Sequence, residues 1–218
     1  MRALILIVGL GLMLVSCGMA LTVASVEPIQ RSIIYIHVPA SICAIACFIV
    51  LFVCSIKYLQ SKNPRWDFVS EASAEAGLVF ATVLNLTGMI FAYAEWNVWW
   101  TPSPRLISSA VLWFLYAAYL ILRTSFSSQQ RKEQISAVFG IIAFLDVPLV
   151  LISARFIRDI HRPAFSFDTA WQNATFTVAI FGTALFAAAL IWIRKDVLKI
   201  KHSLKSHGPH HNITEPSK

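Results

Sequence analysis

Two histidines and a cluster of tryptophans are the residues of this sequence whose types and spacing could do chemistry. His37 occurs in "YIHVPAS" and His161 in "RDIHRPAF", and each is followed by a proline within two residues. The other histidines all lie after residue 201. Between His37 and His161, the stretch "WNVWWTPSPR" places Trp96, Trp99 and Trp100 within five residues.

Imidazoles beside indole rings suit a large planar ligand that carries a metal. Two neutral imidazoles can ligate one metal ion from opposite sides. Haem fits this combination: iron for the imidazoles of His37 and His161, a flat macrocycle for the indoles, and propionates for guanidinium groups. No CxxCH motif is present, so a non-covalent, b-type haem is expected. The arginines available for the propionates are Arg31, Arg105 and Arg162.

The elements that must position these residues are membrane-spanning helices. Of the 218 residues, 57% are hydrophobic and 13% are charged, against about 25% charged in a soluble chain. This excludes a soluble domain and intrinsic disorder. Apolar runs of this length in lipid must be helical, because each backbone polar group needs an internal partner. The runs are 3–26, 33–56, 72–94, 106–122, 134–153 and 173–193.

The distribution of basic residues predicts the orientation of these six helices. Of the 18 lysines and arginines, thirteen fall at one set of helix ends and five at the other. Basic residues favour the cytoplasmic side, so both termini should be cytoplasmic. The net charge of +7 then reflects topology rather than nucleic-acid binding. The outer face should hold segments 27–32, 95–105 and 154–172, with His37 at the outer end of the second span and Pro39 in its first turn.

The tryptophans should form a short helix on the outer membrane surface. Trp96, Trp99 and Trp100 stand at i, i+3 and i+4, which is one face of a helix. Pro102 and Pro104 would end it. An alternative interpretation is an ordinary aromatic belt at the membrane boundary.

With these motifs in place, the chain resembles the CcmC family, the haem-handling membrane proteins of bacterial cytochrome c maturation system I. The family's tryptophan-rich motif, W-x-x-W-W-x-W-D-x-R-L, aligns without a gap with "WNVWWTPSPRL" (96–106). Thr87-Gly88 matches a Thr-Gly pair typical of the family. "YIHVPA" and "SARFIRDIH" match its two histidine motifs.

The resemblance implies a function and a set of partners. In such proteins the two outer histidines are the axial ligands of haem, and the tryptophan-rich segment holds the macrocycle. The protein presents haem to the periplasmic chaperone CcmE in the bacterial inner membrane, beside the CcmA–CcmB transporter and the small subunit CcmD. It is not an enzyme in the strict sense.

The sequence departs from the family pattern in two places. The family's Trp-Asp pair is Pro102-Ser103 here, which shrinks the aromatic platform and removes one polar contact. The paired aromatics before the second histidine are Phe156-Ile157. Neither change removes a proposed iron ligand.

Two other functions remain open on the sequence alone. A b-type haem anchor subunit of a quinone-linked electron-transfer complex is the first, although such anchors usually bury their histidines within spans. A larger haem lyase is the second, although it carries additional histidines within its spans. At the N-terminus, "LVSC" (14–17) also resembles a lipoprotein cleavage site.

Polar residues within the spans and in the tail complete the picture. Asp146 and Asn85 lie at similar depths in the fifth and third spans, and a hydrogen bond between them is expected. The chain should divide into a six-span domain (1–193) and a basic, histidine-containing cytoplasmic tail (194–218). The start of that tail can lie on anionic lipid.

Overall fold

Seven helices make up the part of the chain that the computed structural model describes, which comprises residues 1–24, 32–156 and 167–207. Six helical segments are long and apolar enough to cross a membrane, with α5 and most of α6 together forming the fifth, Gln129–Ser153. The predicted all-helical, six-span architecture is therefore confirmed. The helices are α1 (Arg2–Leu21), α2 (Ile34–Ser61), α3 (Pro64–Trp96), α4 (Pro104–Thr124), α5 (Gln129–Ala143), α6 (Asp146–Phe156) and α7 (Ala170–His207).

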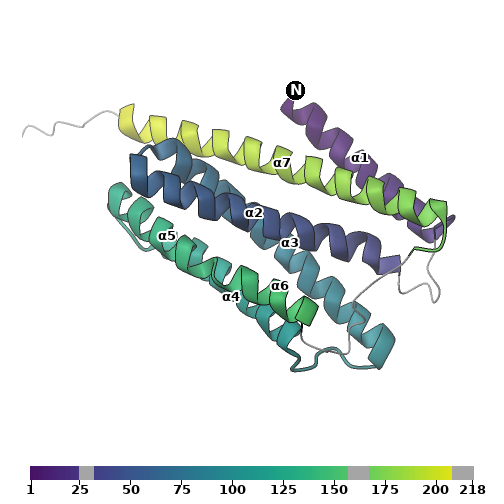
Figure 1. Ribbon diagram of the computed structural model, residues 1–218. Coiled ribbons are helices and arrows are strands. Elements are labelled where there is room, and N and C mark those ends of the chain that lie inside the picture. The colour runs from purple at the N-terminus through teal and green to yellow at the C-terminus, as the bar shows by residue number, and fades with distance from the viewer. Residues whose placement is uncertain (25–31, 157–166, 208–218) are drawn as a thin grey trace, which may run out of the picture.

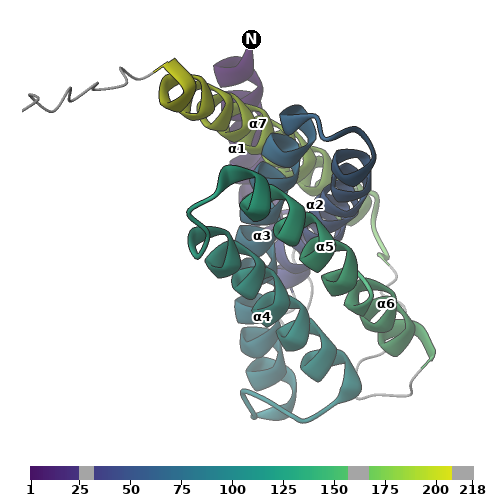
Figure 2. The same cartoon turned by 90° about the vertical axis from the view of Figure 1, so that its left-hand side faces the viewer.

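The helices are arranged in three layers (Figures 1 and 2). The pair α1 and α7 forms one outer layer, α2 and α3 form the middle layer, and α4 with α5 and α6 forms the other outer layer. Among the described elements, the middle layer is the only one that packs against both others. The site therefore depends on how α2 and α3 fit together.

Glycine allows the closest approach of α2 and α3. A Cβ atom on Gly77 of α3 would come within 2.5 Å of the Phe48 ring of α2, a distance that only glycine avoids. Phe48 in turn stacks on Tyr116 of α4, with ring centroids 3.6 Å apart. Small residues at such crossings are how membrane helices gain packing contacts. The same principle joins α1 to α7, where Gly9 and Gly182 meet opposite backbone.

A two-residue turn fixes α3 antiparallel to α2. Lys62 ends α2 in the left-handed conformation, with φ of 53°. Asn63 then caps α3, because its side chain accepts a hydrogen bond from the Arg65 backbone N–H at 3.1 Å. Pro64 occupies the first helical position, where its missing N–H costs nothing. The first turn of α2 must consequently lie beside the last turns of α3.

The fifth span is broken between α5 and α6. Pro148 has no N–H to donate to the Phe144 carbonyl, and its ring crowds that carbonyl. The Val147 N–H donates to the same carbonyl at 3.0 Å in a tighter turn. Phe144 and Leu145 therefore form a turn, and α6 starts at Asp146. The break differs from the single apolar run, 134–153, that the sequence predicts for this span.

The helix α7 does not end where the last apolar run ends. It continues past Ile193 to His207. Arg194 forms a two-point ion pair with Glu75 of α3, with Nε–Oε2 and Nη2–Oε1 distances of 2.5 and 2.7 Å. Leu198 is buried with Phe68. Residues 208–218 lie outside the described part, and the division into a domain and a cytoplasmic tail stays a prediction.

Candidate haem-binding end

His37 lies in the first turn of α2 and is held by a threonine of α3. Its Nδ1 atom is 2.9 Å from the Thr87 hydroxyl oxygen. That hydroxyl also lies 2.6 Å from the Val83 carbonyl oxygen, to which it donates. A hydroxyl has one proton, so both hydrogen bonds form together only if His37 donates from Nδ1. The remaining ring nitrogen, Nε2, is then the basic one.

This tautomer has a direct chemical meaning. An imidazole ligates a metal through its unprotonated nitrogen, and a partner on the other nitrogen fixes the tautomer and the ring orientation. Gly88 contributes to the same arrangement, because a Cβ there would lie 3.3 Å from His37 Cε1. The Thr87-Gly88 pair thus provides both the acceptor and the room for the ring. The sequence showed the pair but gave no role for it.

Pro39 lies deeper in α2 than the sequence suggested. Because α2 already begins at Ile34, Pro39 is an interior residue of the helix and not part of its first turn. It has no N–H for the Tyr35 carbonyl. The Ser41 hydroxyl, two residues beyond Pro39, donates to the His37 carbonyl at 2.7 Å.

The predicted tryptophan-rich surface helix is wrong. The helix α3 runs on to Trp96 and ends at Asn97, whose φ of 55° is left-handed. Residues 97–103 contain no helical turn, because Pro102 and Pro104 hold the residues before them extended. Residues 98–101, between Asn97 and Pro102, are too few for a helix. Ser103 then caps α4 by accepting from the Leu106 N–H at 3.4 Å.

Two of the three tryptophans lie in this extended segment, and both are accessible. Trp99 is 54% exposed and Trp100 is 40% exposed. Trp99 stacks on Tyr93 of α3, with ring centroids 4.4 Å apart and planes at 14°. Trp96 meets Phe91 edge to face at 5.8 Å. The aromatic surface is therefore supported by α3, and its outer rings are open to a ligand or to lipid.

Helix ends from four spans meet at this end of the molecule, which we call the histidine end. It comprises His37, the segment 96–103 and Arg105 in the first turn of α4. The end of α6 joins it, since the Ser153 and Ser108 hydroxyls lie 3.1 Å apart. Phe167, just before α7, stacks on Tyr35 at 5.7 Å.

The remaining predicted site residues are not placed. His161, Arg31 and Arg162 lie outside the described residues. However, Ser153 and Phe167, which flank the segment that contains His161, both contact the histidine end. The described chain thus contacts this end of the molecule at Ser153 and again at Phe167.

The expected hydrogen bond between Asn85 and Asp146 is also wrong. The Asn85 amide donates to the Ala81 carbonyl and accepts from the Ser109 hydroxyl, which links α3 to α4. Asp146 starts α6 at the helix break. Its Oδ2 atom is buried without a hydrogen-bond partner among the residues that the structure describes.

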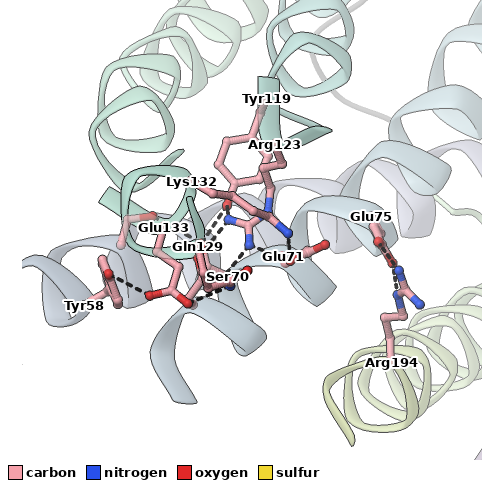
Figure 3. A network of polar contacts seen from close by, with 12 residues as sticks. Tyr58, Ser70, Glu71, Glu75, Tyr119, Arg123, Gln129, Lys132, Glu133 and Arg194 are labelled. Atoms are coloured by element: carbon pink, nitrogen blue, oxygen red, sulfur yellow. Dashed lines mark hydrogen bonds and ion pairs between the residues drawn. The ribbon is translucent and has the colours of Figure 1, made fainter. Parts of the chain in front are cut away.

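At the opposite end lies a buried ion cluster that was not predicted from the sequence (Figure 3). Arg123 of α4 is 3% exposed and pairs at two points with Asp67 of α3, at 2.8 and 2.7 Å. It also pairs with Glu71 at 2.5 Å. Tyr58 of α2 donates to Glu133 of α5 at 2.8 Å. The signal was the spacing of Asp67, Glu71 and Glu75, which places three carboxylates on one helix face.

The fold and this site define a six-span helical membrane protein that presents a histidine and exposed tryptophans at one end. Residues 1–207 match the family described as CcmC, heme exporter protein C. The chain belongs to the CcmC family, whose members act in cytochrome c biogenesis.

Individual relatives agree with this assignment at low identity. Heme exporter protein C of Rhodobacter capsulatus is 24% identical over 174 residues, which cover 76% of this chain and 72% of the relative. That of Escherichia coli K12 is 27% identical over 166 residues, or 74% of this chain and 67% of the relative. A putative cytochrome c biosynthesis ccmC-like mitochondrial protein of Marchantia polymorpha is 24% identical over 159 residues, or 73% and 62%. The chain thus spans about two thirds of the length of these relatives.

The ion cluster at the end opposite His37 should make a large contribution to stability. Replacing Arg123 with Gln leaves the buried Asp67 without its cation, whereas Glu71 keeps Lys132 at 3.8 Å. Breaking a buried pair in this way costs roughly 3–5 kcal/mol. The free energy of unfolding, measured by denaturant titration in detergent, should fall by about this amount. Arg131→Gln, at an exposed position on α5, is the matched control, and equal stability of the two variants would contradict the role given to Arg123.

Proposed function

We propose that this protein binds haem at the histidine end and delivers it to a periplasmic, CcmE-like haem chaperone for cytochrome c maturation. His37 and His161 are the axial ligands of the iron. Trp96, Trp99 and Trp100 carry the macrocycle, and Arg31, Arg105 and Arg162 are the candidates for the propionates. The single observation that carries this proposal is the His37–Thr87 contact.

The described residues fit the chemistry of haem. The Nδ1–H of His37 is engaged by Thr87, so Nε2 is the nitrogen that would ligate iron. Two exposed indole rings provide apolar, planar surface beyond the end of α3, the helix that carries Thr87. His37 lies at the end of its span and not midway, which argues against the electron-transfer anchor. The site holds and orients the ligand, and its position at a helix end leaves the ligand accessible to a chaperone.

The proposed topology places this site on the periplasmic side of the bacterial inner membrane. The end opposite His37 holds Arg2, Lys62, Arg65, Arg123 and Arg194, and such concentrations of basic residues favour the cytoplasm. Both termini are then cytoplasmic. CcmA- and CcmB-like transporter subunits and a CcmD-like small subunit are the expected partners within the bilayer. Hydrolysis of a nucleotide would come from the transporter, because this sequence has no phosphate-binding loop.

The orientation is tested by reporter fusions. Fusions after residues 62, 98, 128 and 165 should read cytoplasmic, periplasmic, cytoplasmic and periplasmic, because the basic residues anchor the first and third of these loops inside. Alkaline phosphatase activity and fluorescence of a cytoplasm-specific reporter give opposite signals at each site. A periplasmic signal at 128 would overturn the model.

The iron ligands are tested by absorption spectroscopy of the purified protein. The wild-type protein should carry six-coordinate, low-spin haem. His37→Ala and His161→Ala should each give a five-coordinate or water-ligated spectrum, and added imidazole should restore the low-spin bands by filling the vacant position. His202→Ala is the control. His202 lies near the C-terminal end of α7, whereas residue 161 precedes the N-terminal end of this helix in the sequence. Low-spin spectra in both variants without imidazole would refute the assignment.

Thr87 is tested as the residue that orients His37. Thr87→Val keeps the shape of the side chain but removes the acceptor for Nδ1–H. Loss of such a partner typically costs about 10–100-fold in metal affinity, so the haem dissociation constant should rise by this factor. Thr87→Ser should restore binding.

Thr82→Val provides the matched control on the same helix. The Thr82 hydroxyl donates to the Leu78 carbonyl and accepts from Trp113 Nε1 at 2.8 Å, away from His37. The haem affinity of this variant should be unchanged. If Thr87→Val and Thr82→Val bind haem equally well, Thr87 does not position the ligand.

A further inference from the structure

A cavity of about 550 Å³ lies at the end of the molecule opposite His37. It is formed where the start of α3 meets the C-terminal part of α7, next to the two-residue turn between α2 and α3. Phe68, which lines the cavity, belongs to a buried cluster with Leu198 of α7. Figure 1 shows this part of α7, coloured yellow, beside the ends of α2 and α3. The residues that give it its character are Arg65, Trp66, Phe68, Lys195, Lys199 and His202.

The charge of this cavity is unbalanced. Three cationic side chains line it, from Arg65, Lys195 and Lys199, against one carboxylate, that of Asp196. That carboxylate already pairs with Arg2 and lies 3.4 Å from Lys195 Nζ. In the described part of the chain, no acidic side chain forms an ion pair with Arg65 or Lys199. The cavity therefore has an excess of positive charge that suits an anion.

The cavity also lies at the membrane boundary. The apolar run of α7 ends at Ile193, two residues before the cavity-lining Lys195. Trp66 has two cations over its ring, Lys57 Nζ at 4.5 Å and Arg65 Cζ at 4.6 Å. Tryptophans with adjacent basic residues are typical of the level of lipid headgroups.

The apolar lining distinguishes this cavity from a simple phosphate site. Trp66, Phe68 and Val69 share its walls with the cations. Phe68 also meets the His202 ring edge to face, with centroids 5.4 Å apart. Just beyond the cavity, α7 exposes Val197, Ile200 and Leu204. A ligand that combines a negative phosphate with an apolar body matches this mixture.

We propose that this cavity binds the headgroup of an anionic phospholipid, with Arg65, Lys195 and Lys199 around the phosphate. Lys195, Lys199 and His202 follow one another at i, i+4 and i+7, so they share one face of α7. Basic pockets between membrane helices are recognised sites for such headgroups. The bound lipid would join α3 to α7 next to the ion pair of Glu75 and Arg194. This site is independent of the haem proposal and of the orientation of the protein.

The proposal is tested by measuring lipids bound to the purified full-length protein. The protein is transferred to mild detergent, mixed with equal amounts of phosphatidylglycerol and phosphatidylethanolamine, and analysed by native mass spectrometry. Phosphatidylglycerol should bind in clear preference. Each basic residue near an anionic headgroup strengthens binding by about fivefold. Lys195→Gln with Lys199→Gln should therefore weaken phosphatidylglycerol binding by about 25-fold.

The controls separate this site from general charge attraction. Arg131→Gln with Lys201→Gln removes the same charge at the same end, but both residues are exposed and neither lines the cavity. This variant should bind phosphatidylglycerol as the wild type does. Lys195→Arg with Lys199→Arg should also retain binding. If the double glutamine variant does not fold, as judged by circular dichroism, Arg65→Gln should weaken binding by about fivefold.

Three results would overturn the proposal. The first is equal binding of the two phospholipids by the wild-type protein. The second is an equal loss of binding in the cavity variant and in its charge-matched control. The third is complete displacement of phosphatidylglycerol by millimolar inorganic phosphate, which would show that the cavity selects a free anion and not a lipid.

Discussion

The close packing of α2 against α3 is the constraint on which the rest of this structure depends. The turn at Lys62 and Asn63 leaves no slack between the two helices, and Gly77 lets Phe48 lie against the α3 backbone. These two features fix the register over the whole length of the pair. His37 lies some 25 residues before the turn, and Thr87 lies about as many after it. Because the register is fixed, the His37 Nδ1 atom and the Thr87 hydroxyl oxygen are 2.9 Å apart. The turn at one end of the bundle thus determines where the His37 imidazole lies at the other end.

The two ends of the molecule are stabilised by different physical means. At the end that holds Arg123, buried charges are matched at short range, and each carboxylate that faces Arg123 receives a donor. At the histidine end, the contact that orients His37 joins two neutral groups, an imidazole and a hydroxyl. A neutral imidazole is the form that can ligate a metal. The family assignment agrees with a role in cytochrome c biogenesis and does not depend on this difference.

The sequence predicted the spans well because lipid allows few alternatives. Each apolar run had to be a helix, and the charges at its ends delimited it. The Trp96–Trp100 segment was predicted wrongly because a spacing of i, i+3 and i+4 says nothing about where a helix ends. Asn97 adopts a left-handed conformation and ends α3 within this segment. The ion cluster around Arg123 escaped notice because counting charges for topology says nothing about which of them are buried. The role of Thr87 depended on a contact across 50 residues, which no local pattern reveals.

The break at Phe144 and Leu145 changes how the two halves of the fifth span move relative to each other. A continuous helix behaves as a rod, so a tilt at one tip reappears at the other. Here the hydrogen-bond ladder is interrupted midway by Pro148, while Ser153 is tied sideways to Ser108 of α4. The last described part of this span, α6, therefore takes its position from α4, the helix that also follows the tryptophans. Both halves of the span pack on α4, so the break lets α5 and α6 tilt separately while one helix supports them both.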